Sequence, residues 1–192
     1  MALPRLILAS ASPRRAELMR QLNLDFQVIT SEVPEVDHRQ LTAGEIAQIN
    51  AYRKARSVSK RFPDYLVLGA DTVVSLGVRL FGKPADLGEA RRMLETLQGQ
   101  THQVVTGVCL VSLRHRRERL FAEITDVSFR PLTAQQITEY LAAINPLDKA
   151  GAYAIQERGD ALVQDIDGSF SNVVGLPLER LRVELDRWEG KV

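Results

Sequence analysis

Strand-like apolar runs alternate along this chain with segments that carry helix-capping signals, and this alternation constrains the fold more than any other feature. The runs have the length of strands and occupy residues 5–10, 25–30, 65–77 and 102–113. A residue suited to cap a helix precedes each of four amphipathic segments, at Ser12, Thr42, Asp86 and Thr133. Strands that alternate with helices predict an α/β fold.

Two predicted hairpins make the expected sheet a mixed one. The run at 65–77 returns through 78–84 across a turn near Gly77, and the run at 102–113 pairs with 119–132 across a basic turn. The sequence shows no internal repeat and no linker. We therefore expect a single domain over residues 1–192, with a mixed twisted sheet and flanking helices.

Composition argues against several classes of protein. The formal net charge is only +1, so no overall basic field favours binding to nucleic acid or to a membrane surface. No apolar stretch reaches the roughly 18 residues that span a bilayer. The one cysteine, Cys109, lies in an apolar run, which predicts a buried thiol. The first residues lack the pattern of a secretion signal, so we expect a soluble cytoplasmic protein.

Arg14 and Arg15 stand in the first turn of the helix that Ser12 is expected to cap, where the positive end of the helix dipole disfavours cations. Backbone N–H groups, the hydroxyls of Ser10 and Ser12 and two guanidinium groups at one turn would suit a bound phosphate. The alternative is a pair of solvated arginines on a surface helix.

Asp71 interrupts the apolar run at 65–77. Burying a carboxylate is costly unless it is paired, hydrogen-bonded or holding a cation. We expect Asp71 at the carboxyl end of a buried strand, where ligands bind in open α/β sheets. The alternative is a structural aspartate that accepts hydrogen bonds from neighbouring backbone N–H groups.

Two lysines are further candidates. Lys54 shares a helix face with Ala47, Ala51 and Val58, which directs it toward the core or a cleft beside it. Its alternative is a lysine whose stem is buried and whose ammonium is solvated. Lys83 follows Gly82 in a tight loop, although the pattern of a phosphate-binding P-loop is absent from the chain.

A metal site built on histidine or cysteine is not expected. His38, His102 and His115 lie far apart in the sequence, and Cys109 has no cysteine partner. Glu35 is a possible second carboxylate beside Asp71, unless it is simply a solvated loop residue. Two carboxylates near several cations favour an oxygen-liganded ion such as Mg²⁺, bound together with substrate phosphates.

Seven segments of the sequence together resemble the Maf proteins, in order and over nearly the whole chain. They are "LASASPRR", Lys54–Ala55, "LGADTVV", "GKP", "LQGQTHQVVTGV", "DKAGAYAIQ" and "IDGSFSNVVGLP". The resemblance implies a bilobal α/β fold with a central cleft, related to the inosine triphosphate pyrophosphatases. It also implies an enzyme that cleaves nucleoside triphosphates to the monophosphate and pyrophosphate with a divalent metal, Mg²⁺ or Mn²⁺.

The resemblance further implies roles for individual residues. Asp71 matches the family's catalytic proton acceptor and, with Glu35, its metal-binding carboxylates. The other matches to the phosphate and metal cleft are Ser10, Arg14, Arg15, Lys54 and Lys83. The segment "DKAGAYAIQ" is similar to the branch that acts on dTTP and UTP, whose specificity positions correspond to Arg14, Thr72 and Gln156. A homodimer is implied only by the resemblance.

Three other functions remain open at this point. One is the family branch that acts on 7-methyl-GTP, and another is a non-enzymatic regulator of septum formation. The third, a nucleic-acid-binding module, would depend on the short basic turn between Arg114 and Arg119.

Overall fold

A computed structural model describes residues 4–36 and 40–190. Within these residues one mixed sheet contains seven strands and is flanked by helices, which confirms the α/β prediction. The strands are β1 (Leu6–Ala9), β2 (Phe26–Val28), β3 (Leu66–Leu76), β4 (Arg79–Phe81), β5 (Thr101–Ser112), β6 (Arg117–Phe129) and β7 (Val163–Asp167). The longer helices are α1 (Pro13–Arg20), α2 (Ala43–Arg61), α3 (Leu87–Leu97), α4 (Ala134–Ala143) and α7 (Leu178–Glu189).

The sheet order is β2-β1-β3-β5-β6-β7, with β4 paired to the outer part of β3. Strand β1 runs parallel to β2 and β3, and the other pairings are antiparallel, so both predicted hairpins are present. The pairing of β1 with β3 ends where Ala9 lies opposite Gly69, whereas β3 continues to Leu76.

The prediction that Asp71 lies at the carboxyl end of its strand is therefore wrong. Asp71 lies in the middle of β3, because the antiparallel partner β5 extends the strand well beyond the end of β1. The strand that ends beside this part of β3 is β1, and its last residues lead into the turn that begins α1. A ligand site at the end of a parallel strand is still formed, but by β1 rather than by β3.

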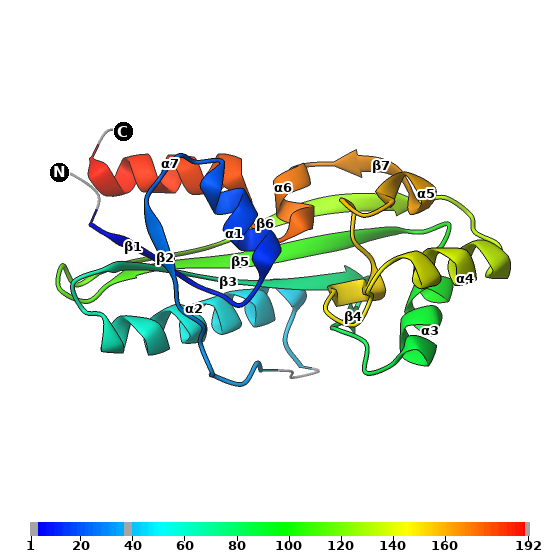
Figure 1. Cartoon of the computed structure of the whole chain (residues 1–192), viewed down its shortest axis with the longest axis horizontal. Coiled ribbons are helices and arrows are strands. Elements are labelled where there is room, and N and C mark those ends of the chain that lie inside the picture. Colours follow the sequence, from blue (N-terminus) through cyan, green and yellow to red (C-terminus); the bar gives the residue numbers. More distant parts are fainter. Residues whose placement is uncertain (1–3, 37–39, 191–192) are drawn as a thin grey trace.

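Helices cover both faces of the sheet (Figure 1). Helix α2 lies on one face, where Ala51, Ala55 and Val58 pack against β1, β3 and β5. Helices α1 and α7 cover the opposite face of the same strands, and α3 and α4 lie near the other end of the long strands. Cys109 is buried beneath α2 as predicted, and burial raises the pKa of its thiol to about 12.

Two glycines allow α2 to approach the sheet closely. A Cβ added at Gly69 would lie 2.4 Å from the carbonyl oxygen of Ala51, and one added at Gly107 would lie 2.4 Å from that of Ala47. Such distances are far inside van der Waals contact, so a side chain at either position would push the helix outward. The close contact places the next helical positions, Asn50 and Lys54, within reach of Asp71.

The predicted helix starts are confirmed in atomic detail. The side chains of Ser12 and Asp86 each accept a hydrogen bond from the backbone N–H three residues later, and Thr42 and Thr133 form complete capping boxes. These signals are local in sequence, which is why they can be recognised before the fold is known.

The region from 150 to 176 contains more helix than expected. The sequence "GAYAIQERGDALVQDIDGSFSNVVGLP", residues 151–177, predicts loop and a short strand, and β7 is a strand within it. It also contains three short helices, η1 (Ala150–Ala152), α5 (Gly159–Leu162) and α6 (Phe170–Val174). Helices of three to five residues are too short to show a helical period in the sequence. The bilobal form, the central cleft between lobes and the single domain over 1–192 stay predictions.

Candidate active site

A cavity of about 720 Å³ opens where β1 ends, between α2 on one side and α1 on the other. All nine residues singled out from the sequence line it, namely Ser10, Arg14, Arg15, Glu35, Lys54, Asp71, Thr72, Lys83 and Gln156. They come from segments as far apart in sequence as the first turn of α1 and the loop after η1. Their catalytic and binding roles stay predictions.

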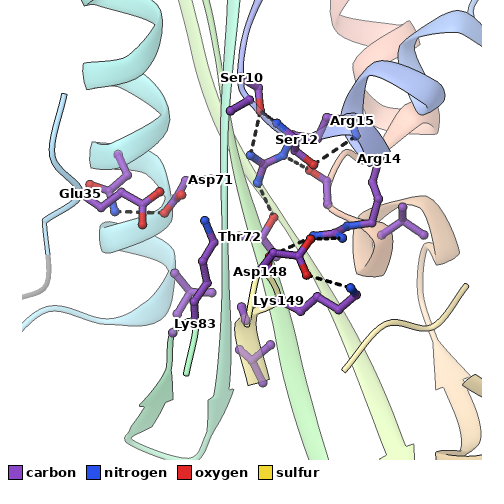
Figure 2. Close-up of a pocket in the computed structure, with 18 of the residues that line it drawn as sticks. Ser10, Ser12, Arg14, Arg15, Glu35, Asp71, Thr72, Lys83, Asp148 and Lys149 are labelled. Atoms are coloured by element: carbon purple, nitrogen blue, oxygen red, sulfur yellow. Dashed lines mark hydrogen bonds and ion pairs between the residues drawn. The ribbon is translucent and has the colours of Figure 1, made fainter. Parts of the chain in front are cut away.

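Asp71 and Thr72 divide the site into two halves, because consecutive residues of a strand point to opposite faces of the sheet. Figure 2 shows Glu35 and Asp71 on one side of β3 and Thr72, Arg14 and Arg15 on the other. The first half faces α2 and carries the carboxylates, and the second faces α1 and carries the arginines.

In the α2 half, Lys54 links the two carboxylates. Its Nζ donates hydrogen bonds to Oδ1 of Asp71 at 2.7 Å and to Oε1 of Glu35 at 2.6 Å. The side chains of Lys54 and Asp71 are only 13% and 8% exposed, whereas that of Glu35 is 50% exposed. The lysine therefore does not place its ammonium in solvent but neutralises a buried aspartate.

The ionisation of Glu35 responds to the same cations. Burial alone would raise the pKa of Glu35, but the hydrogen bond and charge of Lys54 oppose this, and the charges of Lys83 and Arg15 add to the effect. The net result is a pKa below the usual value for glutamate. Glu35 is thus held as an anion beside the cavity.

Asn50 is a part of the site that the sequence did not reveal. It is buried on α2 one turn before Lys54, and its Nδ2 donates to Oδ2 of Asp71 at 3.0 Å. The same amide accepts from the backbone N–H of Val36 at 2.7 Å and donates to its carbonyl at 3.2 Å. Asn50 therefore fixes Asp71 and also the backbone next to Glu35. An asparagine inside an amphipathic helix gives no signal of this kind in the sequence.

In the α1 half, Arg15 is held by three acceptors. Its NH2 group donates to Oγ1 of Thr72 at 2.9 Å, its Nε to the carbonyl of Gly175 at 2.8 Å, and its NH1 to Oγ of Ser10 at 3.3 Å. Burial lowers the pKa of Arg15, while the nearby charges of Asp71 and Glu35 act in the opposite direction. Because Gly175 has φ of +120°, a residue with a side chain would be strained there.

Arg14 has a different partner, which was also missed. Its NH1 donates to Oδ2 of Asp148 at 2.9 Å and its NH2 to the backbone carbonyl of the same residue at 3.1 Å. The two residues are 134 positions apart in the chain, so no local pattern could connect them. The solvated arginines of the alternative interpretation are not what the structure contains.

Lys83 and Gln156 remain available to a ligand. Both are exposed residues in the lining of the cavity, and neither has a hydrogen-bond or ion-pair partner among the residues described by the structure. Figure 2 shows the Lys83 side chain pointing into the cavity. One free cation and one free amide thus lie at the cavity surface.

The carboxylates provide the best candidate cation site. Both Asp71 and Glu35 reach the same ammonium group, so their oxygens can be directed at one cation. In residues 4–36 and 40–190 no group of three or more His, Cys, Asp or Glu side chains could hold a metal. His102 and His115 bond instead to Tyr153 and Ser112, and His38 lies outside the described residues. A metal here would need further ligands from a substrate or from water.

The arrangement suits a ligand with several negative charges. Five cationic residues line the cavity, namely Arg14, Arg15, Lys54, Lys83 and Lys149. A carboxylate that can act as a base lies among them, held in place by hydrogen bonds to both of its oxygens. Within the described residues, no helix is long and apolar enough to cross a membrane.

Comparison with known proteins agrees with this chemistry. A protein of Symbiobacterium thermophilum named dTTP/UTP pyrophosphatase is 51% identical over 178 residues, covering 91% of this chain and 89% of its own. Proteins of the same name from Acetivibrio thermocellus and Alkaliphilus oremlandii are 45% and 44% identical, each pair aligned over more than nine tenths of both chains. The model of the family described as "Maf-like protein" matches residues 5–188. The chain is therefore a member of the Maf family, as its sequence motifs predicted.

Proposed function

We propose that this protein is a nucleoside triphosphate pyrophosphatase that hydrolyses dTTP and UTP to the nucleoside monophosphate and pyrophosphate. The observation that carries the proposal is the buried Asp71 carboxylate, set among cations in a cavity of about 720 Å³. Relatives named dTTP/UTP pyrophosphatase, at 42–51% identity, support the choice of substrate. Removal of unwanted or modified nucleotides would be a use for such an activity.

In the proposed reaction, a water molecule attacks the α-phosphorus and the bond to the bridging oxygen of the β-phosphate breaks. The bond electrons leave with pyrophosphate, and Asp71 accepts the proton of the attacking water. Lys54 fixes the carboxylate through Oδ1 and Asn50 fixes it through Oδ2, so the base is positioned before substrate binds. Lys83 has no partner among the described residues and is free to offset charge that develops on the phosphates.

A divalent cation fits the carboxylate pair. Asp71 and Glu35 would hold it, because their oxygens are the hard ligands that Mg²⁺ and Mn²⁺ favour and already converge on one positive group. When bound, the cation supplies neutralisation of phosphate charge. With the cation bound, Lys54 would either keep its contacts with the two carboxylates from the α2 side or contact the phosphates of the substrate.

The nucleobase is proposed to be recognised by polar side chains of the cavity lining that do not belong to the carboxylate pair. Gln156 lines the cavity with an amide that has no hydrogen-bond partner in the described part of the chain, and an amide offers both donors and an acceptor. This matches the adjacent carbonyl and N–H groups that uracil and thymine share. Cytosine reverses that pattern with its N3 and exocyclic amine. Arg14 and Thr72 line the same cavity and complete the proposed specificity positions.

The test is pyrophosphate release from a panel of nucleotides with Mg²⁺ or Mn²⁺. We expect dTTP and UTP to be the best substrates, CTP much poorer, and GTP and ATP poorest. If 7-methyl-GTP were the best substrate, the pyrophosphatase assignment would stand and the dTTP/UTP assignment would be wrong. Release from none of them would overturn the enzyme assignment and favour a non-enzymatic role such as control of septum formation. A homodimer and a cytoplasmic location stay predictions.

A further inference from the structure

Asp148 connects two parts of the cavity lining that are far apart in the chain. One side of its carboxylate and its backbone carbonyl together bind the Arg14 guanidinium on α1, at 2.9 and 3.1 Å. A charge-assisted pair of bonds with this geometry restricts an arginine strongly. Figure 2 shows the pair at the side of the cavity away from Glu35 and Asp71.

The other carboxylate oxygen is held by Lys149, whose side chain is only 5% exposed. Lys149 Nζ donates to Oδ1 of Asp148 at 2.8 Å and to the backbone carbonyl of Asn145 at 2.6 Å. It also forms an ion pair with Oε1 of Glu157 at 3.3 Å. Glu157 directly follows Gln156, so the network extends from α1 to the residue beside the free amide.

The charges of this network favour an ionised Asp148. Burial alone would raise the pKa of Asp148, but the hydrogen bonds and charges of Lys149 and Arg14 hold that pKa below its usual value. The carboxylate is thus an anion between two cations, and both of its oxygens have partners.

The bonds to Asp148 determine which part of a bound ligand Arg14 can contact. Two bonds to Asp148 direct Arg14 away from the carboxylates Glu35 and Asp71 (Figure 2). Lys54 bonds to Asp71 and Glu35, and the charges of Lys83 and Arg15 help to lower the pKa of Glu35, so these three cations are the ones beside the carboxylates. Arg14 and Gln156 both line the cavity, and the chain of contacts from Arg14 through Asp148 and Lys149 ends at Glu157, the residue after Gln156.

We propose that Asp148 is a specificity-determining positioning residue, which holds Arg14 and the Gln156 segment in one fixed arrangement around the nucleotide base. The inference rests on the proposed function and deepens it. Asp148 acts through Arg14 and Lys149 and takes no part in the bond-breaking step. Its loss should therefore reduce discrimination between bases more than it reduces turnover of the preferred nucleotide.

The experiment is a double-mutant cycle on nucleotide selectivity. Asp148→Asn, Arg14→Ala and the double variant are compared with the wild type by kcat/KM for dTTP and for CTP. An asparagine keeps the shape but turns an N–H toward either Arg14 or Lys149, so one of the two bonds is lost. Asp64→Asn is the matched control, because Asp64 also pairs with an arginine, Arg114, but outside the cavity.

We expect Asp148→Asn to lower the dTTP-to-CTP ratio of kcat/KM about 10-fold, the scale of a mispositioned polar contact. The kcat for dTTP should fall by less than about 3-fold, and Asp64→Asn should change neither quantity. In the Arg14→Ala background, Asp148→Asn should lower the ratio by less than it does in the wild type, because only the link through Lys149 to the Gln156 segment is left to lose. An unfolding curve for each variant identifies loss of the folded protein, which would lower kcat/KM for both nucleotides equally.

An unchanged ratio in Asp148→Asn, or effects of the two substitutions that simply add, would overturn the inference. Both results leave the proposed function intact, since the wild type would still release pyrophosphate from dTTP. A wild type that releases none overturns the proposed function and the inference together.

Discussion

Replacing Lys54 with methionine removes the positive charge between the two carboxylates and leaves most of the apolar stem in place. The ammonium contacts Asp71 at 2.7 Å and Glu35 at 2.6 Å, and it is 13% exposed. If it is an integral counter-ion, Lys54→Met should destabilise the protein substantially. If it were a solvated lysine, the substitution would have little effect.

The expected magnitude follows from burial. Removing one partner of a buried ion pair costs about 3–5 kcal/mol, because the other charge is left uncompensated. Asn50 still donates to Oδ2 of Asp71 in the variant, which favours the lower end of that range. The pair with half-exposed Glu35 adds only about 0–1 kcal/mol. We therefore expect a loss of about 3 kcal/mol in the free energy of unfolding.

The assay is urea unfolding at pH 7.5 without divalent cations. Lys60→Met is the matched control, because Lys60 is an exposed residue on the same helix. A loss below about 0.5 kcal/mol, the range of ordinary surface substitutions, would refute the counter-ion role.

The same variant provides a readout of the proposed cation site without any catalysis. With the ammonium gone, Asp71 and Glu35 are left as two carboxylates with no cation between them. Mn²⁺ should therefore raise the free energy of unfolding of Lys54→Met more than that of the wild type. Equal stabilisation of both proteins by Mn²⁺ would count against these two residues as its ligands.

Three further predictions concern the catalytic base Asp71, the specificity residue Gln156 and the buried His102. Asp71→Asn should lower kcat by at least about 100-fold in a folded protein, because an amide cannot accept the proton; near-normal turnover would remove Asp71 from this role. Gln156→Ala should reduce the dTTP-to-CTP ratio of kcat/KM more than kcat itself, and an unchanged ratio would exclude Gln156 from base selection. Burial lowers the pKa of His102 to about 4, only partly opposed by the charge of Asp126, so its contribution to stability is complete above pH 6.5 and is lost as the pH falls toward 4. Between pH 7.5 and 4.5, urea unfolding should show a loss in the wild type that exceeds the loss in His102→Gln by about 2.5 kcal/mol; parallel curves would contradict this explanation.

The sequence predicted those features of the fold whose signals are local. The capping boxes at Thr42 and Thr133 located two helices, and the long apolar runs located β3 and β5. The helical spacing of Lys54 with three small or apolar residues correctly indicated a side chain directed inward. Each of these inferences depends on residues within a few positions of one another.

The sequence could not predict which distant residues would meet. Asp148 lies 134 positions from Arg14, and Asn50 lies 21 positions from Asp71, so their hydrogen bonds exist only once the sheet order is fixed. The place of Asp71 in the middle of β3 was missed for the same reason, because it depends on where the neighbouring strand β1 ends. The resemblance to the Maf family assigned these residues to one site by analogy, without predicting the contacts between them.

In the proposed reaction, water attacks the α-phosphorus of dTTP and Asp71 accepts its proton. Its most direct test is a turnover of dTTP by the wild type in water enriched in ¹⁸O, followed by mass spectrometry of both products. We predict dTMP that carries one ¹⁸O atom and pyrophosphate that carries none. Label in the pyrophosphate, or formation of dTDP and inorganic phosphate, would contradict attack of water on the α-phosphorus.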